Sequence, residues 1–90
     1  MAVIHKYPLL VQDEQTIETE NPFHILSLQV QNGVPCLWVV KNEDFKTKYV
    51  LKIKTLGTGQ TFHNFNDNYI GTYQLDGFVW HVFSTVQISI

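Results

Sequence analysis

The segment from His24 to Gln31 alternates between apolar and polar residues with a period of two, as a strand with one buried face does. Asn32 and Gly33 follow, and this dipeptide is a strong signal for a two-residue hairpin turn because both residues tolerate positive φ. We therefore predict a hairpin over residues 25–40, at the centre of the sheet. Its register about the turn opposes Leu28 to Leu37 and Leu26 to Val39, which predicts that these four side chains are buried.

A second hairpin is predicted from Tyr69 to Ser84, closed by Asp76 and Gly77. The same counting opposes Leu75 to Phe78, Tyr73 to Trp80, and Gly71 to Val82. Gly71 has no side chain, so we expect a neighbouring aromatic ring to cover the hollow beside it. His81 falls opposite Thr72, a position that suits an imidazole with a structural role.

Shorter alternating segments indicate further strands around the two hairpins. They cover residues 2–7, 16–19, 45–56 and 86–90, whereas residues 12–15 favour a short helix. Seven or eight short strands in 90 residues predict one all-β domain over residues 1–90. We expect a small antiparallel sandwich or a rolled sheet.

The composition excludes several classes of protein. Cys36 is the single cysteine, so no internal disulfide can form, and the first ten residues lack the pattern of a secretory signal. Both features favour a cytoplasmic protein. The chain has no apolar run long enough to span a membrane, so we expect no membrane association. It also has no arginine, the residue that best binds phosphates and guanine edges, which argues against a nucleic-acid partner.

A glycine-rich turn is the first candidate binding site. Gly57, Thr58, Gly59 and Thr61 could hold an anion, because successive backbone amides in such a turn can form a concave donor site. The motif is too short for a phosphate-binding loop and does not lead into a helix. A tight turn between two strands is the simpler interpretation.

A lysine-rich face is the second candidate. Lys46, Lys48, Lys52 and Lys54 alternate along one predicted strand and therefore share one face. They could contact an acidic partner, or the acidic segment Asp13–Glu20 of another subunit. The simpler interpretation is that they confer solubility and protect a sheet edge.

The C-terminal alternation is the third candidate. Val86, Ile88 and Ile90 could fill one face of a strand that completes the sheet of a neighbouring copy. Symmetric closure of such a contact would give a homodimer. Alternatively, the tail pairs with its own sheet and the protein is a monomer.

No catalytic or metal-binding pattern emerges from the remaining residues. The four histidines lack ligand spacing, and Cys36 has no base near it in sequence. We therefore expect a protein that is not an enzyme and that needs no metal or cofactor.

Five short sequence motifs carry a resemblance to a known family: Lys6–Leu9, Gln31–Trp38, Gly57–Gly59, Tyr69–Thr72 and Phe78–Phe83. Together they resemble an uncharacterised family of small proteins encoded in bacteriophages and prophages. This resemblance covers nearly the whole chain and implies a setting in the cytoplasm of a bacterial host. It does not imply any catalytic residue.

The expectation that follows from this setting is a non-enzymatic accessory protein that binds a host protein. In phages, such a protein could inhibit a host defence system, as anti-CRISPR proteins do. Two alternatives remain open: a sponge that sequesters a nucleotide signal, and a structural or assembly protein of the virion.

Overall fold

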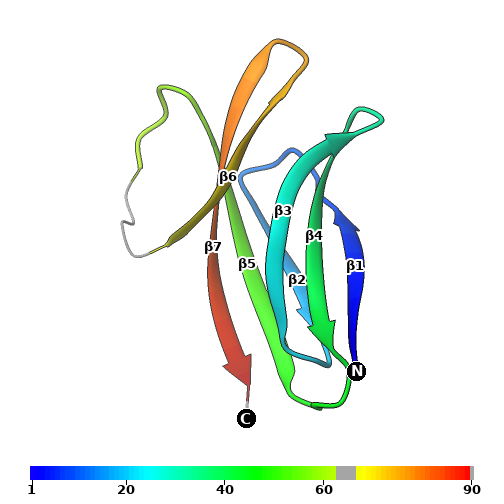
Figure 1. Ribbon diagram of the computed structural model, residues 1–90. Helices are drawn as coiled ribbons and strands as arrows, with labels where there is room; N and C mark the ends of the chain where they lie inside the picture. Colours follow the sequence, from blue (N-terminus) through cyan, green and yellow to red (C-terminus); the bar gives the residue numbers. More distant parts are fainter. Residues whose placement is uncertain (63–66, 90) are drawn as a thin grey trace.

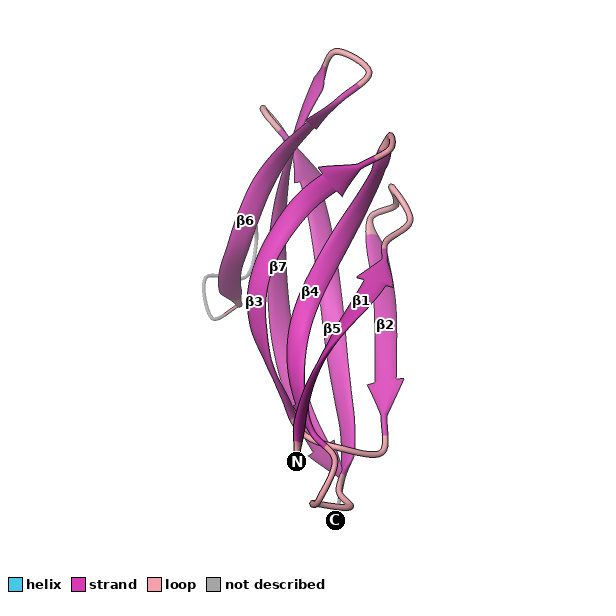
Figure 2. Ribbon diagram, turned by 45° about the vertical axis from the view of Figure 1, so that its right-hand side comes forward, coloured by secondary structure: helices cyan, strands magenta, loops and turns pink. Residues whose placement is uncertain are grey.

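A computed structural model describes residues 1–62 and 67–89 of the chain. Across these residues the chain forms seven β-strands and no helix, in two antiparallel sheets that face each other (Figures 1 and 2). One sheet has three strands in the order β1-β4-β3, and the other has four in the order β2-β5-β7-β6. The strands are β1 (Ala2–Pro8), β2 (Glu14–Thr19), β3 (Phe23–Gln31), β4 (Val34–Asn42), β5 (Lys48–Gly57), β6 (Asn68–Leu75) and β7 (Phe78–Ser89). The all-β sandwich predicted from the sequence is therefore confirmed.

The first hairpin forms as β3 and β4, but its register is only partly as predicted. Asn32 and Gly33 both have positive φ, 52° and 78°, and Leu28 lies opposite Leu37. A β-bulge at Leu26 then shifts the pairing, so that Ile25 and not Leu26 lies opposite Val39. The prediction that Leu26 is buried was wrong, because the bulge leaves this side chain 53% exposed.

The position of this hairpin in the sheet also differs from the prediction. Only β4 is central, between β1 and β3, whereas β3 is an edge strand of its sheet. Its outer side is covered in part by the other sheet, since β3 contacts β6. The hairpin therefore joins the two sheets at one side of the sandwich.

The second hairpin, β6 and β7, has the predicted register from its turn as far as Gly71. Leu75 lies opposite Phe78, Tyr73 opposite Trp80 and Gly71 opposite Val82, with a bulge at Ile70 just before this stretch. The hollow at Gly71 is filled by an aliphatic side chain and not by the aromatic ring we expected. A Cβ at Gly71 would lie 3.4 Å from a terminal methyl carbon of Leu28.

The short helix expected at residues 12–15 does not form. Glu14 and Gln15 pair with β5 as the first residues of β2. The side-chain amide of Gln15 donates to the carbonyl of Leu10 at 2.7 Å, and its amide oxygen accepts from the Leu10 N–H at 3.0 Å. Local side-chain bonds of this kind compete with a helix whose nucleus would be only one turn long. Residues 9–13 are therefore a loop that glutamine side chains hold in place.

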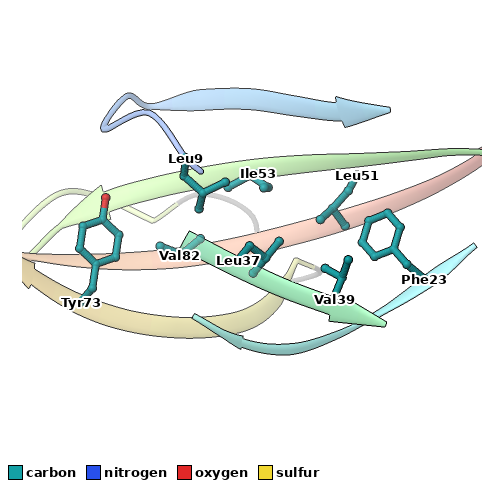
Figure 3. Packing of buried hydrophobic residues seen from close by; sticks show 8 residues of the cluster. All are labelled: Leu9, Phe23, Leu37, Val39, Leu51, Ile53, Tyr73 and Val82. Carbon is teal, nitrogen blue, oxygen red and sulfur yellow. The ribbon is translucent and has the colours of Figure 1, made fainter. Parts of the chain in front are cut away.

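The core lies between the two sheets and draws on both of them (Figure 3). β4 contributes two fully buried side chains from the three-stranded sheet, and β5 and β7 contribute three from the four-stranded sheet. Leu9 enters from the loop after β1, and Phe23 packs on Tyr49 with a ring separation of 4.9 Å. The buried cluster comprises Leu9, Phe23, Leu37, Val39, Leu51, Ile53, Tyr73 and Val82.

Tyr73 brings a polar atom into this core. Its hydroxyl is buried, and no atom of the described residues forms a hydrogen bond with it. Desolvation of the phenol raises the pKa of Tyr73 above its ordinary value. An unsatisfied buried hydroxyl destabilises the folded state by about 1–3 kcal/mol relative to a partnered one.

We predict that Tyr73→Phe leaves the free energy of unfolding unchanged or raises it by up to ~1 kcal/mol. The difference should widen at alkaline pH. Because the folded pKa is raised, the unfolded chain ionises first, and the wild type loses stability as pH rises beyond about 10. Urea midpoints of both proteins at about pH 8 and about pH 10.5 measure this. Equal losses in both proteins would show that Tyr73 is not the group responsible.

Candidate functional site

The glycine turn that follows β5 is closed by its own polar groups. The Gly57 N–H donates to the side-chain oxygen of Gln60 at 2.5 Å, and the Gln60 N–H donates to the Gly57 carbonyl at 3.1 Å. The Thr58 N–H points to the carbonyl of Val79 at 3.4 Å. Three amides at this turn are thus directed to acceptors within the chain, so the turn resembles a structural connection more than an anion site.

The same turn begins a chain of polar side chains on the outer face of the four-stranded sheet. His81 Nε2 lies 2.8 Å from Thr58 Oγ1, and His81 Nδ1 lies 3.1 Å from Thr72 Oγ1. Thr72 Oγ1 in turn lies 2.5 Å from the hydroxyl of Tyr69. The structural role expected for His81 opposite Thr72 agrees with this geometry. Thr58, the second partner of His81, and Tyr69, the partner of Thr72, were missed, because neither is adjacent to His81 in the register.

This chain of hydroxyl and imidazole groups lacks the third member of a hydrolytic triad. In a triad, a carboxylate or amide orients the histidine and stabilises its positive charge, but both ring nitrogens of His81 meet threonine hydroxyls. Cys36, the other candidate nucleophile, is 2% exposed, and its Sγ lies 3.5 Å from the Val34 carbonyl oxygen. A thiol in this position packs as a small apolar group.

The lysine-rich face lies on β5, an inner strand between β2 and β7. Lys48, Lys52 and Lys54 alternate with buried residues along β5, whereas Lys46 precedes the strand. The interpretation as protection of a sheet edge was therefore wrong. The edge position belongs to β2, whose Glu14 lies directly opposite Lys54.

The acidic segment expected to meet these lysines from another subunit is thus their neighbour in the same chain. β2 carries Glu14 and Glu18 along β5, and the Nζ of Lys54 also lies 3.4 Å from a carboxylate oxygen of the buried Asp67. A cavity of about 510 Å³ is lined here by Lys52 and Lys54 together with Glu14 and Asp67. Two ammonium groups facing two carboxylates leave little net charge for a phosphate ligand.

The C-terminal strand pairs with its own sheet. β7 continues to Ser89 and runs antiparallel to β5, with Val86 opposite Leu51 and Ile88 opposite Tyr49. The segment therefore belongs to its own sheet, as in the alternative left open, whereas its contact with a neighbouring copy, and with it the choice between monomer and homodimer, stays a prediction. Ile90, the third residue of the expected assembly strand, lies outside the described residues.

A groove lies beside this strand, between β3 of one sheet and strands β6 and β7 of the other. It encloses about 340 Å³ and is lined on one side by β3, at Ile25 and Leu26, and on the other by Tyr69 and Val86. Leu26 and Val86 are apolar side chains that remain exposed here, whereas the hydroxyl of Tyr69 contacts Thr72 on the outer face of the sheet. Sequence reasoning could not locate this groove, because it depends on the bulge at Leu26 and on where β6 begins.

Further exposed apolar side chains lie at the end of the sandwich that carries the β1–β2 loop and the β3–β4 and β6–β7 turns, and we call this end the loop end (Figures 1 and 2). Leu10 is 64% exposed in the β1–β2 loop, and Phe78 is 63% exposed beside the β6–β7 turn. Val11, Val30 and Val34 are also exposed and belong to the same loops or flank the same turns. Alternation along the sequence did not single out this surface, since it combines three connections that are far apart in the chain.

The part of the chain that the structure describes contains neither a cluster of metal ligands nor a membrane-spanning helix. Within residues 1–62 and 67–89, no three side chains of the His, Cys, Asp or Glu types come together as a metal site would need. None of these residues belongs to a helix with the length and apolarity needed to cross a lipid bilayer.

Fold and site define the chain as an antiparallel two-sheet β-sandwich with exposed apolar surfaces at its loop end and along one side. Its sequence matches the family model described as Domain of unknown function (DUF7352) over residues 1–89, and the chain belongs to this family. Searches of curated proteins and of solved structures found no match. The resemblance to an uncharacterised family is thus confirmed at the level of the family, without an activity attached to it.

Proposed function

We propose that this chain is a non-enzymatic binding domain that acts by contact with another protein. The observation that carries the proposal is the loop end, where Leu10 and Phe78 each remain more than 60% exposed. Small soluble domains seldom leave several large apolar side chains together at one end, and such surfaces commonly mark protein interfaces. Loops gathered at one end of a β-sandwich are also a common place for recognition.

The chemistry of the loop end suggests what kind of partner it fits. Its apolar side chains come from three separate connections, so a partner must cover a surface and not a single pocket. Asp13 and Asp76 are exposed beside these side chains, in the β1–β2 loop and the β6–β7 turn. A folded protein with an apolar patch and basic residues around it would complement both features.

In the phage or prophage setting that the sequence resemblance implies, this partner would be a host protein in the bacterial cytoplasm. Inhibition of a host defence system, as by anti-CRISPR proteins, is the most specific form of the proposal. A nucleotide sponge is favoured less, because the cavity beside Lys52 and Lys54 balances its charge with Glu14 and Asp67. A virion assembly role would also use apolar surfaces, but the partner recovered would then be another virion protein and not a host protein.

We predict that the double substitution Leu10→Ser and Phe78→Ser abolishes recovery of the partner while leaving the fold intact. Both side chains are exposed, so their replacement removes apolar contact area without opening a cavity. Tagged wild type and variant, expressed in the cells that encode the protein, are compared by affinity recovery and quantitative mass spectrometry of the bound proteins.

The matched control is Phe45→Ser, because Phe45 is equally exposed but lies between β4 and β5, outside the loop end. The proposal requires that this variant recovers the same partner as the wild type. Recovery of one partner by all three proteins, or its loss only from the Phe45 variant, would show that the loop end is not the binding surface.

A further inference from the structure

We infer that a second copy of this chain binds along the free edge of β7, through antiparallel pairing of the two β7 strands about a two-fold axis. This contact uses the side of the sandwich and does not depend on the loop end. It makes the strand addition expected from the sequence specific, because each β7 keeps its place beside β5 and offers only its opposite edge.

The edge exists because β6 covers only part of β7. The pairing of β6 with β7 reaches from Leu75 opposite Phe78 to Asn68 opposite Ser84. From Thr85 to Ser89, β7 pairs with β5, and among the described residues no strand lies on its other side (Figure 1). Five residues of β7 therefore present a sheet edge.

The direction of the backbone groups along this edge follows from the turn. In a two-residue hairpin the residues that flank the turn bond to each other, so the N–H and C=O of Phe78 point toward β6. The carbonyl of the next residue, Val79, faces β5, where the Thr58 N–H approaches it at 3.4 Å. Because β7 pairs with β5 without a register shift, this alternation continues, and the backbone groups of Val86 and Ile88 point to the free edge.

Nothing in the sequence of this segment protects the edge. Residues 85–90 contain no charged residue and no proline, the features that usually discourage the addition of a strand. Three of them are β-branched valine or isoleucine, which favour strands. Val86 is 39% exposed and lines the groove between β3 and β7 described above, whose lining contains no lysine, aspartate or glutamate.

A two-fold axis at Gln87 satisfies this edge with an identical one. Gln87 then lies opposite Gln87 of the other copy, and Val86 lies opposite Ile88 of the other copy in both directions, so that the outward backbone groups meet as donors and acceptors. The pairing spans Thr85 to Ser89, which is the length that β6 leaves open. The β7 strand of each copy thus pairs with residues 85–89 of the other copy, on the same edge where β6 pairs with residues 78–84.

The test uses Val86→Pro and Val86→Thr as a matched pair. Proline removes an N–H that faces the free edge, and edge positions whose N–H faces solvent tolerate it, so β7 can still pair with β5. Threonine is β-branched and keeps the donor. We expect sedimentation equilibrium to show a wild-type dimer, a threonine variant with the same dissociation constant, and a proline variant whose constant is raised about tenfold or more, since hydrogen bonds are lost on both sides of the axis.

Circular dichroism and thermal melting show whether the proline variant is folded. If it is not, a second variant tests the same edge. Val86→Lys keeps the backbone donor but brings two like charges close to the axis, so it should also weaken the dimer, and added salt should partly restore it. Amide exchange at Val86 and Ile88 should be slow in the wild-type dimer and fast in the lysine variant. A wild type that stays monomeric at millimolar concentration, or folded proline and lysine variants that dimerise as the wild type does, would overturn the inference.

Discussion

Leu37→Ala is expected to lower the free energy of unfolding by about 2–5 kcal/mol, because its side chain is fully buried and its removal leaves a cavity. Leu37 lies on β4, the central strand of its sheet, and faces the core formed with β5 and β7. A domain of this size has a total stability of only about 5–15 kcal/mol. Urea denaturation followed by tryptophan fluorescence measures the loss, which should populate the unfolded state well below the wild-type midpoint.

Leu26→Ala is the control for this prediction, because it removes the same atoms from the neighbouring strand. Leu26 is 53% exposed at the bulge, so its replacement should change the free energy of unfolding by no more than about 0.5 kcal/mol. Equal losses for the two variants would mean that Leu26 is in the core and that β3 pairs with β4 without a bulge.

Gly71→Val is expected to destabilise the chain by about 1–3 kcal/mol, because the new side chain would press on Leu28 across the contact between β6 and β3. A Cβ alone at this position would lie 3.4 Å from the nearest Leu28 carbon, and the valine methyl groups need more room than that. The measurement is again the urea midpoint. A stabilised variant would show that the space beside Gly71 is open.

The double variant Gly71→Val with Leu28→Ala separates this steric effect from a general loss of strand stability. Shortening Leu28 makes room for the valine, so the double variant should lose less than the sum of the two single losses, with a coupling of about 0.5–3 kcal/mol. Simple additivity would contradict the direct contact between these two positions.

The turns account for what could be predicted of the fold from the sequence. Asn32-Gly33 and Asp76-Gly77 fix the register of the strands that they join, and both dipeptides adopt the positive φ values that such turns need. Pairs close to each turn, such as Leu28 with Leu37 and Tyr73 with Trp80, were therefore predicted correctly.

The bulges account for what could not be predicted. Regular alternation places Leu26 in the core, in phase with Leu28, but the preceding Ile25 is apolar as well. A bulge can therefore exchange the two residues without burying a polar one, and only packing against the other sheet decides between them. The bulge at Leu26 then leaves that residue exposed, and the groove beside β7 follows from it.

The candidate sites depended even more on contacts that are distant in sequence. The lysines of β5 were recognised as one face, but their neighbour is the acidic strand β2, more than 30 residues earlier in the chain. The loop end likewise combines Leu10, Val30 and Phe78 from three connections. Alternation describes one strand at a time and does not say which strands are adjacent.

Native mass spectrometry of the protein purified gently from the cells that encode it tests the proposed function most directly. The account predicts a stoichiometric complex with a second, larger protein, and its loss when Leu10 and Phe78 are both replaced by serine. A chain that carries a nucleotide mass and no second protein, in amounts unaffected by that double substitution, would contradict the proposal and favour the sponge.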